Sequence, residues 1–145
     1  MHNTWRLLID PPADGAANMA RDEAILSCHA VGAMQPTLRL YRWRPACLSL
    51  GRFQRSSAVD RAACARAEVT IVRRPSGGRA LLHDAELTYA IIARADYTLF
   101  GDQSILTTYR QISLALLAGL RRLGVPADLT PVSRDERRRT NDEGR

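Results

Sequence analysis

Arg73-Arg74-Pro75-Ser76-Gly77-Gly78-Arg79-Ala80-Leu81-Leu82-His83-Asp84 separates two apolar, strand-like stretches of the chain. The Gly-Gly pair allows a tight turn whose backbone N–H groups face a ligand. The planar guanidinium of arginine matches carboxylate and phosphate oxygens, and a return strand would bring His83 over the loop, where Asp84 could orient it. The segment therefore predicts a pocket for an anion or for the carboxyl end of an acyl group. The alternative from the residues alone is a hairpin turn with solvated arginines.

Strand-like and helix-like stretches alternate along the rest of the chain. Alternating or β-branched residues predict strands over residues 5–10, 37–43, 46–50, 69–73 and 86–93. Helices are predicted over residues 16–30, 57–67 and 104–123. Residues 86–93 are apolar on both faces, so we expect this strand at the centre of a sheet that helices cover.

The first predicted helix has a line of residues at helical spacing, Met19, Glu23 and Leu26. Asn18 and Asp22 lie near its start, where their side chains are expected to accept hydrogen bonds from free N–H groups.

The last predicted helix has a single apolar stripe, which indicates a core-facing side. We expect Asp102 or Ser104 to cap its start and Gly124 to end it. The stripe consists of Ile105, Tyr109, Ile112, Leu116, Leu120 and Leu123.

The composition predicts one globular domain over residues 1–133 and a charged, disordered tail over residues 134–145. The chain has 145 residues and a net charge of +6, and all 21 of its basic residues are arginine. No lysine is therefore present for a Schiff base or as a point charge on a phosphate. The acids interleaved in the tail oppose binding to nucleic acid. Without a membrane span or a secretory signal in the sequence, we expect a cytoplasmic protein.

The cysteines predict neither disulfides nor a metal site. Cys28, Cys47 and Cys64 are odd in number and lack the spacing of metal ligands. We expect them to be core thiols in a reducing compartment.

Several separate blocks resemble the lipoate–protein ligase and octanoyltransferase family, which is related to biotin–protein ligases. Residues 73–84 match its pattern Arg-Arg-x-[Ser/Thr]-Gly-Gly-[Gly/Arg]-Ala-[aliphatic]-x-His-Asp. Arg79 and the following Glu86-Leu87-Thr88-Tyr89 are similar to the M type of octanoyltransferase. Residues 18–24, 38–45 and 49–54 resemble other blocks of the family in the same order, and the resemblance runs from residue 5 to 131. A biotin ligase is disfavoured because its Arg-Gly-Arg-type repeats are not seen.

The resemblance implies a fold and a ligand site. The fold would be a mixed β-sheet flanked by helices, an α/β arrangement shared with class II tRNA synthetases and biotin–protein ligases, here incomplete. The ligand would be an octanoyl or lipoyl group with its activated carboxyl end near the Gly-Gly loop. Tyr41, Asp22 and Glu23 would be structural. The implied substrate-binding residues are Arg73, Arg74, Ser76, Gly77, Gly78, Arg79, Ala80, His83, Trp43, Ser49 and Gly51.

The resemblance implies octanoyl transfer to a lysine of a lipoyl-domain protein. Acyl carrier protein would be the donor, a protein such as glycine cleavage H protein the acceptor, and no cofactor would be needed. The first alternative is a lipoate–protein ligase, which would use ATP and Mg²⁺; the second is a non-catalytic module that binds an acyl group or a lipoyl domain. Family members carry an acyl-accepting cysteine in a Cys-Phe block and a lysine in Gly-x-Lys-x-x-Gly-Ser, and neither block occurs in these residues. We therefore expect the N-terminal half of such an enzyme, inactive by itself, with no catalytic residue and no metal site of its own.

Overall fold

The computed structural model describes residues 4–94 and 104–130. The chain divides into two compact units, Met1–Arg94 and Ala95–Arg145. Three expectations lie outside the described residues: a boundary after residue 133, a disordered tail over residues 134–145, and Asp102 as a helix cap.

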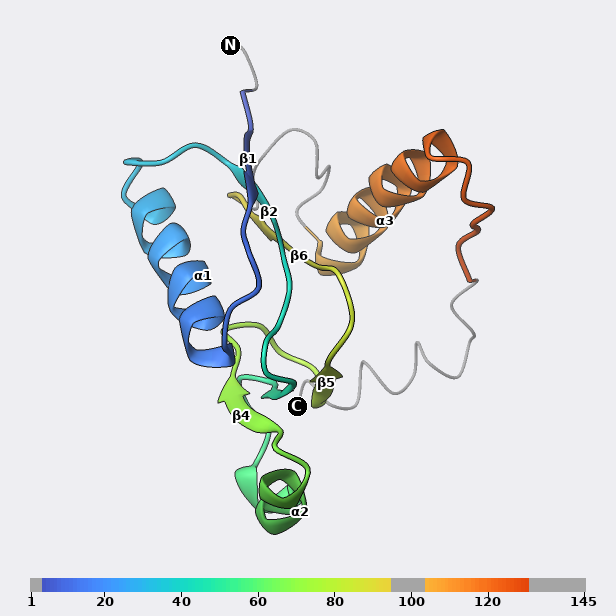
Figure 1. Ribbon diagram of the computed structural model, residues 1–145. Helices are drawn as coiled ribbons and strands as arrows, with labels where there is room; N and C mark the ends of the chain where they lie inside the picture. The colour runs from blue at the N-terminus through green and yellow to red at the C-terminus, as the bar shows by residue number, and fades with distance from the viewer. Residues whose placement is uncertain (1–3, 95–103, 131–145) are drawn as a thin grey trace. The chain divides into compact units, whose positions relative to one another are not determined.

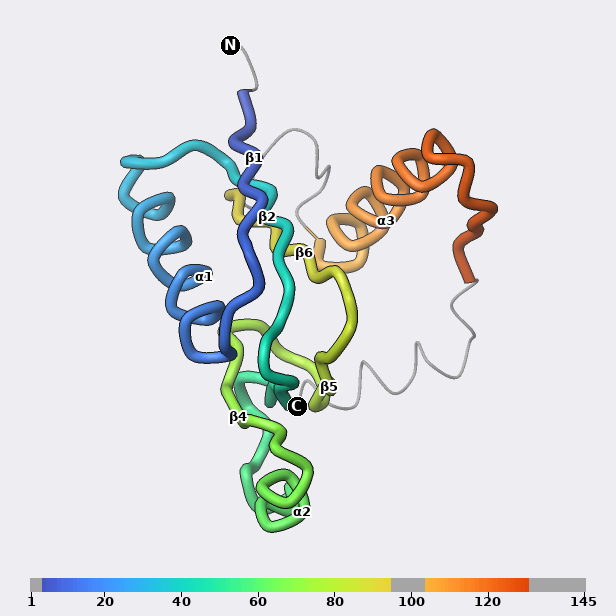
Figure 2. The backbone as a smooth tube through the Cα atoms, in the orientation of Figure 1, coloured from blue at the N-terminus to red at the C-terminus, as the bar shows by residue number. Residues whose placement is uncertain are grey.

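The first unit contains two mixed three-stranded sheets (Figure 1). In one, β2 (Thr37–Tyr41) lies between the parallel strand β1 (Arg6–Ile9) and the antiparallel strand β6 (Thr88–Ile92). In the other, β3 (Cys47–Leu50) lies between the parallel strand β4 (Thr70–Arg73) and the antiparallel strand β5 (Leu81–His83). Figure 2 shows the backbone passing from β2 into β3, and a second short connection leads from β5 to β6, so two short segments join the two sheets. Mixed strand pairing with a flanking helix confirms the predicted α/β class.

Helix α1 (Gly15–Ala30) confirms the first predicted helix, but its start is capped differently. The side chain of Asp14 accepts a hydrogen bond from the backbone N–H of Ala17 at 2.8 Å. The predicted caps Asn18 and Asp22 are instead buried, because they lie on the helix face that packs against the sheets. That face consists of Gly15, Asn18, Met19, Asp22 and Ile25, and it leaves Glu23 and Leu26 exposed.

The two sheets and α1 share one small core. Met19 of α1, Tyr41, Trp43 and Cys47 form its buried cluster, and Val72 and Ala90 pack against them. At Gly15 a Cβ would lie 2.5 Å from the Cys47 sulfur, so only glycine lets α1 approach β3 this closely. The core therefore holds the helix against both sheets.

Strand β2 alternates as predicted, but its polar residues are the buried ones. Thr37, Arg39 and Tyr41 face α1 and are buried, whereas Leu38 and Leu40 are half-buried on the opposite face. Arg39 is completely buried because four groups accept from its guanidinium. They are the carboxylates of Asp10 and Asp22, both at 2.7 Å, and the backbone and side-chain oxygens of Asn18, at 3.0 and 2.8 Å.

The expectation of a central, doubly covered strand over residues 86–93 is wrong for the described part of the chain. There β6 begins only at Thr88 and pairs on one side, with β2. Tyr89 remains 39% exposed, and Ile92 is the strand's buried residue. The apolar residues on both faces of this strand therefore did not mean that it has a strand neighbour on each side. Glu86 lies outside the strand and contacts His83.

The predicted helix over residues 57–67 is divided in two. A 3-10 turn covers Ser56–Ala58, and α2 covers Arg61–Arg66. Val59 between them is extended, and the side chain of Asp60 accepts from the backbone N–H of Ala63 at 2.9 Å. Asp60 thus caps a separate helix rather than lying inside one.

The second unit contains α3 (Ile105–Arg122), which confirms the last predicted helix. Its apolar stripe is not buried as expected: within the part of the chain that the structure describes, no residue of α3 is buried, and Ile105, Tyr109 and Leu123 are exposed. The Ser104 hydroxyl accepts from the backbone N–H of Thr107 at 3.1 Å, so Ser104 is its cap, and Gly124 follows its end at φ +77°. Among the described residues, no helix has both the length and the apolar character needed to cross a membrane.

Replacing Arg39 by Met is expected to lower the free energy of unfolding by about 3–5 kcal/mol, because Asp10 and Asp22 lose the cation that they share. Arg42→Met is the matched control, since Arg42 is exposed and is expected to change stability by less than about 0.5 kcal/mol. Urea unfolding followed by circular dichroism measures both. Equal stability of the two variants would show that the buried ion cluster is dispensable.

Candidate functional site

The Gly-Gly loop lies directly against the end of β3. A Cβ at Gly51 would lie 1.8 Å from the carbonyl oxygen of Gly78, and Gly78 itself has φ +90°. The backbone N–H of Arg52 also donates to the carbonyl of Ser76 at 2.9 Å. The loop thus requires glycine on both sides of the contact.

Arg73 holds the turn that follows β3. Its Nη1 donates to the backbone carbonyls of Gly51 at 2.6 Å, Gln54 at 2.8 Å and Arg52 at 3.1 Å. All the hydrogen bonds that Arg73 makes to described residues use Nη1. Its Nε and Nη2 edge, the fork that pairs with carboxylates, therefore remains for a ligand or for solvent.

Arg74 joins β3 to the Gly-Gly loop. Its Nη1 donates to the backbone oxygen of Ser49 at 3.0 Å and to the Ser49 hydroxyl at 3.1 Å. Its Nη2 donates to the carbonyls of Gly77 and Arg79, both at 2.7 Å. Burial lowers the pKa of Arg74 from its usual value, although a guanidinium stays protonated in proteins. Neither Arg73 nor Arg74 is merely solvated, as the hairpin alternative required.

His83 lies at the centre of a polar cluster beneath the loop. Its Nε2 is 2.8 Å from the Ser49 hydroxyl, and its Nδ1 is 2.6 Å from the Glu86 carboxylate. The ring of Trp43 stacks on the imidazole, with centroids 4.1 Å apart. The expectation that Asp84 orients His83 is wrong. Glu86, three residues after His83, contacts its Nδ1 instead. Glu86 could have been noticed from its i+3 spacing to His83.

Glu86 is ionised by its hydrogen bonds. Its burial alone would raise the pKa of the carboxyl, but donation from His83 and from the Thr88 hydroxyl outweighs burial, and the pKa is lowered from its usual value. Thr88 in turn accepts from the Trp43 indole N–H at 2.7 Å.

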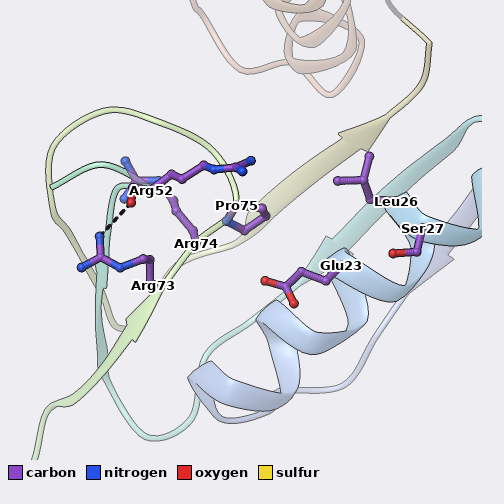
Figure 3. A pocket seen from close by; sticks show the side chains of 7 residues that line it. All are labelled: Glu23, Leu26, Ser27, Arg52, Arg73, Arg74 and Pro75. Atoms are coloured by element: carbon purple, nitrogen blue, oxygen red, sulfur yellow. Dashed lines mark hydrogen bonds between the residues drawn. The ribbon is translucent and has the colours of Figure 1, made fainter. Parts of the chain in front are cut away.

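A pocket of about 460 Å³ opens between α1 and the start of the Gly-Gly loop. Figure 3 shows Glu23, Leu26 and Ser27 on the helix side, facing Pro75 and the arginines of the loop side. The loop side carries Arg52, Arg73 and Arg74, so cationic groups outnumber the single carboxylate. One wall is thus suited to an anionic group, and Leu26 and Pro75 supply apolar surface beside it.

The structure separates the predicted site residues into three sets. Arg73 and Arg74 line the pocket, whereas Ser76, Gly77, Gly78 and Arg79 are exposed on the loop and Ala80 is half-buried after it. The rest are buried beneath the loop and do not line the pocket: Trp43, Ser49, Gly51 and His83.

Sequence reasoning missed the helix wall and one arginine of this pocket. Glu23 was expected to be structural, but it lines the pocket together with Leu26, Ser27 and Arg52. The signal for the three helix residues was the exposed side of α1, opposite its buried face. By contrast Tyr41 and Asp22 are structural, as the resemblance implied, since the Tyr41 hydroxyl donates to Asp22 at 3.2 Å beneath α1.

Of the three cysteines that were expected to be core thiols, Cys47 is the buried one. Cys47 lies opposite His83 in the β3–β5 register, a closeness that the sequence did not reveal. It is nevertheless completely buried, and burial raises the pKa of its thiol, which opposes thiolate formation. Cys28 and Cys64, on α1 and α2, are half-buried. Within residues 4–94 and 104–130, no three potential metal-ligating side chains gather in one place.

Known proteins match nearly the whole chain. The sequence model of the lipoyl protein ligase A/B catalytic domain matches residues 14–142. An octanoyltransferase LipM of Symbiobacterium thermophilum is 45% identical over 139 residues, which are 95% of this chain and 50% of the relative. The chain spans about half the length of the curated relatives that it matches.

Solved structures agree with the fold. A lipoate-protein ligase A bound with ATP superposes with a TM-score of 0.68 at 29% identity, over 92% of this chain and 53% of that chain. The structure of a bi-partite lipoate protein ligase and its E2 lipoyl domain from Thermoplasma acidophilum gives a TM-score of 0.71 at 25% identity, over 90% and 50%.

Replacing Gly51 by Ala is expected to lower the free energy of unfolding by about 1–3 kcal/mol, because the new Cβ meets the backbone oxygen of Gly78 and neither strand nor loop can yield freely. Gly77→Ala is the matched control: nothing lies within 4 Å of its Cβ position, and a change below about 1 kcal/mol is expected. Urea unfolding compares the two. A Gly51→Ala variant as stable as Gly77→Ala would contradict the close packing of loop on strand.

Proposed function

Because this chain belongs to the lipoyl protein ligase A/B catalytic domain family, we propose that it supplies the acyl-binding part of an octanoyl transfer in protein lipoylation. The observation that carries the proposal is the arginine-walled pocket beside α1, in a chain 45% identical to an octanoyltransferase LipM. The donor would be octanoyl-acyl carrier protein, and the acceptor a lysine of a lipoyl-domain protein such as glycine cleavage H protein.

The pocket offers complementary surfaces for the two ends of an acyl group. A carboxyl or thioester oxygen would lie at the cationic wall of Arg52, Arg73 and Arg74, and the hydrocarbon along Leu26 and Pro75. The free Nε and Nη2 edge of Arg73 can take a carboxylate in a two-pronged hydrogen bond. Fixed donors of this kind stabilise charge that develops on a carbonyl oxygen during acyl transfer.

A second candidate function is ATP-dependent lipoate ligation. It is favoured by the likeness to a lipoate-protein ligase A whose structure holds ATP. Arg79 and Glu86 favour the transferase, since ligases of the family carry Gly in place of Arg79 and differ after the His-Asp pair. A non-catalytic module that binds an acyl group or a lipoyl domain is a third candidate, and the absence of lysine from the sequence favours it.

Octanoate is expected to bind this chain more tightly than acetate. Arg73→Ala is expected to weaken octanoate binding by ~2–3 kcal/mol, because it removes charge-assisted hydrogen bonds to the carboxylate. Arg74→Ala is expected to weaken binding by a similar amount, because it removes a cation that lines the pocket and releases the Gly77 and Arg79 carbonyls of the loop. Isothermal titration calorimetry with octanoate, lipoate and an octanoyl-adenylate analogue measures the affinities. Arg52→Ala is the cleaner variant, since among the described residues its guanidinium makes no hydrogen bond or ion pair and lies 5.6 Å from the centre of the Phe53 ring, so its loss is expected to leave the loop in place.

Arg55→Ala is the control for these titrations, because Arg55 is exposed and does not line the pocket. Unchanged affinity in the Arg52, Arg73 and Arg74 variants would reject the arginine wall as the binding site. Equal affinity for acetate and octanoate would reject an acyl pocket and leave a general anion site.

The chain of 145 residues is expected to transfer no octanoyl group by itself, since Cys47 is a buried thiol and no lysine is present. The chain is incubated with octanoyl-acyl carrier protein and a lipoyl domain, or with lipoate, ATP and Mg²⁺, and the acceptor is weighed by mass spectrometry. A modified acceptor in the first mixture would identify a nucleophile within this chain. Modification only in the second would favour the ligase.

A further inference from the structure

A continuous line of hydrogen bonds runs beneath the pocket from a carboxylate to a guanidinium. Glu86 contacts Nδ1 of His83 at 2.6 Å, Nε2 of His83 contacts the Ser49 hydroxyl at 2.8 Å, and the Ser49 hydroxyl accepts from Arg74 at 3.1 Å. We infer that Ser49 and Glu86 are positioning residues: Glu86 orients His83, His83 orients the Ser49 hydroxyl, and that hydroxyl holds Arg74 in the conformation that shapes the Gly-Gly loop.

The two ends of the line determine the direction of each hydrogen bond, because the Glu86 carboxylate only accepts and the Arg74 guanidinium only donates. An ionised carboxylate only accepts, so the Nδ1 of His83 carries the proton that Glu86 receives. In a neutral imidazole Nε2 is then the acceptor, and the Ser49 hydroxyl donates to it. Because the Ser49 hydroxyl donates its hydrogen to His83, the Ser49 oxygen is free to accept from Nη1 of Arg74.

Two neighbours hold the imidazole in this orientation. Trp43 stacks on it with ring planes 10° apart, and the Trp43 indole N–H donates to Thr88, whose hydroxyl donates to Glu86. The opposite tautomer would direct an Nε2 proton at Ser49. Two donors, from His83 and Arg74, would then converge on one buried oxygen, and the hydroxyl proton would need another acceptor.

The order of carboxylate, imidazole and hydroxyl is also that of hydrolytic triads, but this hydroxyl is not placed to attack a substrate. Ser49 has no exposed surface, and its oxygen accepts a hydrogen bond from a guanidinium, which reduces its nucleophilicity. The line ends at the loop instead: the other nitrogen of Arg74, Nη2, holds the carbonyls of Gly77 and Arg79. The tautomer of His83 thereby fixes a residue that lines the pocket.

Imidazole nitrogen NMR of the ¹⁵N-labelled chain tests the tautomer directly. Of the three histidines, His83 is identified by the signals lost in His83→Gln. We expect the Nδ1–H form in the wild type. In Glu86→Gln, whose amide can donate as well as accept, we expect the Nε2–H form or a mixture, as happens when an amide replaces the carboxylate of a catalytic triad. Asp84→Asn, the control two residues away, is expected to retain Nδ1–H.

Amide hydrogen exchange tests the connection to the loop. In Ser49→Ala, exchange of the Arg52 amide, which donates to the Ser76 carbonyl of the loop, is expected to accelerate roughly tenfold, the equivalent of one lost hydrogen bond. The exposed Ser57→Ala is expected to leave it unchanged. Glu86→Gln is expected to accelerate exchange of the same amide, and this variant provides the test if Ser49→Ala does not fold. An Nε2–H wild type, an Asp84→Asn variant that behaves like Glu86→Gln, or unaltered exchange of the Arg52 amide in the folded variants would each overturn the inference.

The inference rests on the proposed function only in treating the loop as the ligand-binding element. Neither measurement uses a ligand, so the inference and the proposed function can be rejected independently of each other. Absence of octanoate binding with an Nδ1–H His83 would reject the proposed function alone. Normal octanoate binding with the opposite tautomer would reject the positioning role alone.

Discussion

The guanidinium of Arg39 has to be neutralised and fully hydrogen-bonded inside the protein, and the elements around it are arranged accordingly. It lies on β2 with no exposed surface and takes acceptors from Asp10, after β1, and from Asn18 and Asp22 on α1. The guanidinium also lies 3.9 Å from the centre of the Tyr41 ring. A buried ion cluster contributes less net stability than its short distances suggest, because both charges lose their hydration. Its geometry is nevertheless specific, since a planar fork accepts few arrangements of its partners.

This constraint reaches the pocket through the orientation of α1. With Asn18 and Asp22 directed at Arg39, and the side-chain amide of Asn18 donating to the carbonyls of Ala13 and Arg42 at 3.1 and 3.0 Å, the rotation of the helix about its axis is fixed. The opposite side of α1 then presents Glu23, Leu26 and Ser27 to the pocket. Gly15 sets the distance of the helix from β3 and β4 through its contacts with Cys47 and Val72. The position of the pocket wall thus follows from a polar cluster that lies outside the pocket.

Local sequence signals predicted most helices and strands, but they did not predict which side chains are buried or which strands pair. The start of α3 at Ser104 and the ends of both helices, before Gly32 and Gly124 at positive φ, follow from short-range features that need no knowledge of the fold. The cap of α1 was predicted less well, because Asn18 and Asp22 are buried and Asp14 takes that role. The burial of β2 could not be predicted in this way, because alternation gives two faces without saying which is inside, and Arg39 is buried only through partners up to 29 residues away. The edge position of β6 depends on pairing, which apolar composition does not encode. At the pocket, Arg73 and Arg74 belong to the motif, whereas the signal for Glu23, Leu26 and Ser27 was only that they lie on the side of α1 opposite its buried face.

Two adjacent arginines that look equivalent in the motif have different tasks in the fold. Arg74 divides both terminal nitrogens between β3 and the loop, so its charge is used mainly to hold carbonyl oxygens in a tight turn. Arg73 concentrates its contacts with described residues on Nη1 and keeps an Nε and Nη2 edge for other partners. Because a lysine has neither the second nitrogen nor the planar fork, it could replace neither arrangement. The arginine pair therefore combines construction of the loop by Arg74 with the anion recognition that we propose for Arg73, and a ligand that binds Arg73 would meet a loop whose shape Arg74 has already fixed.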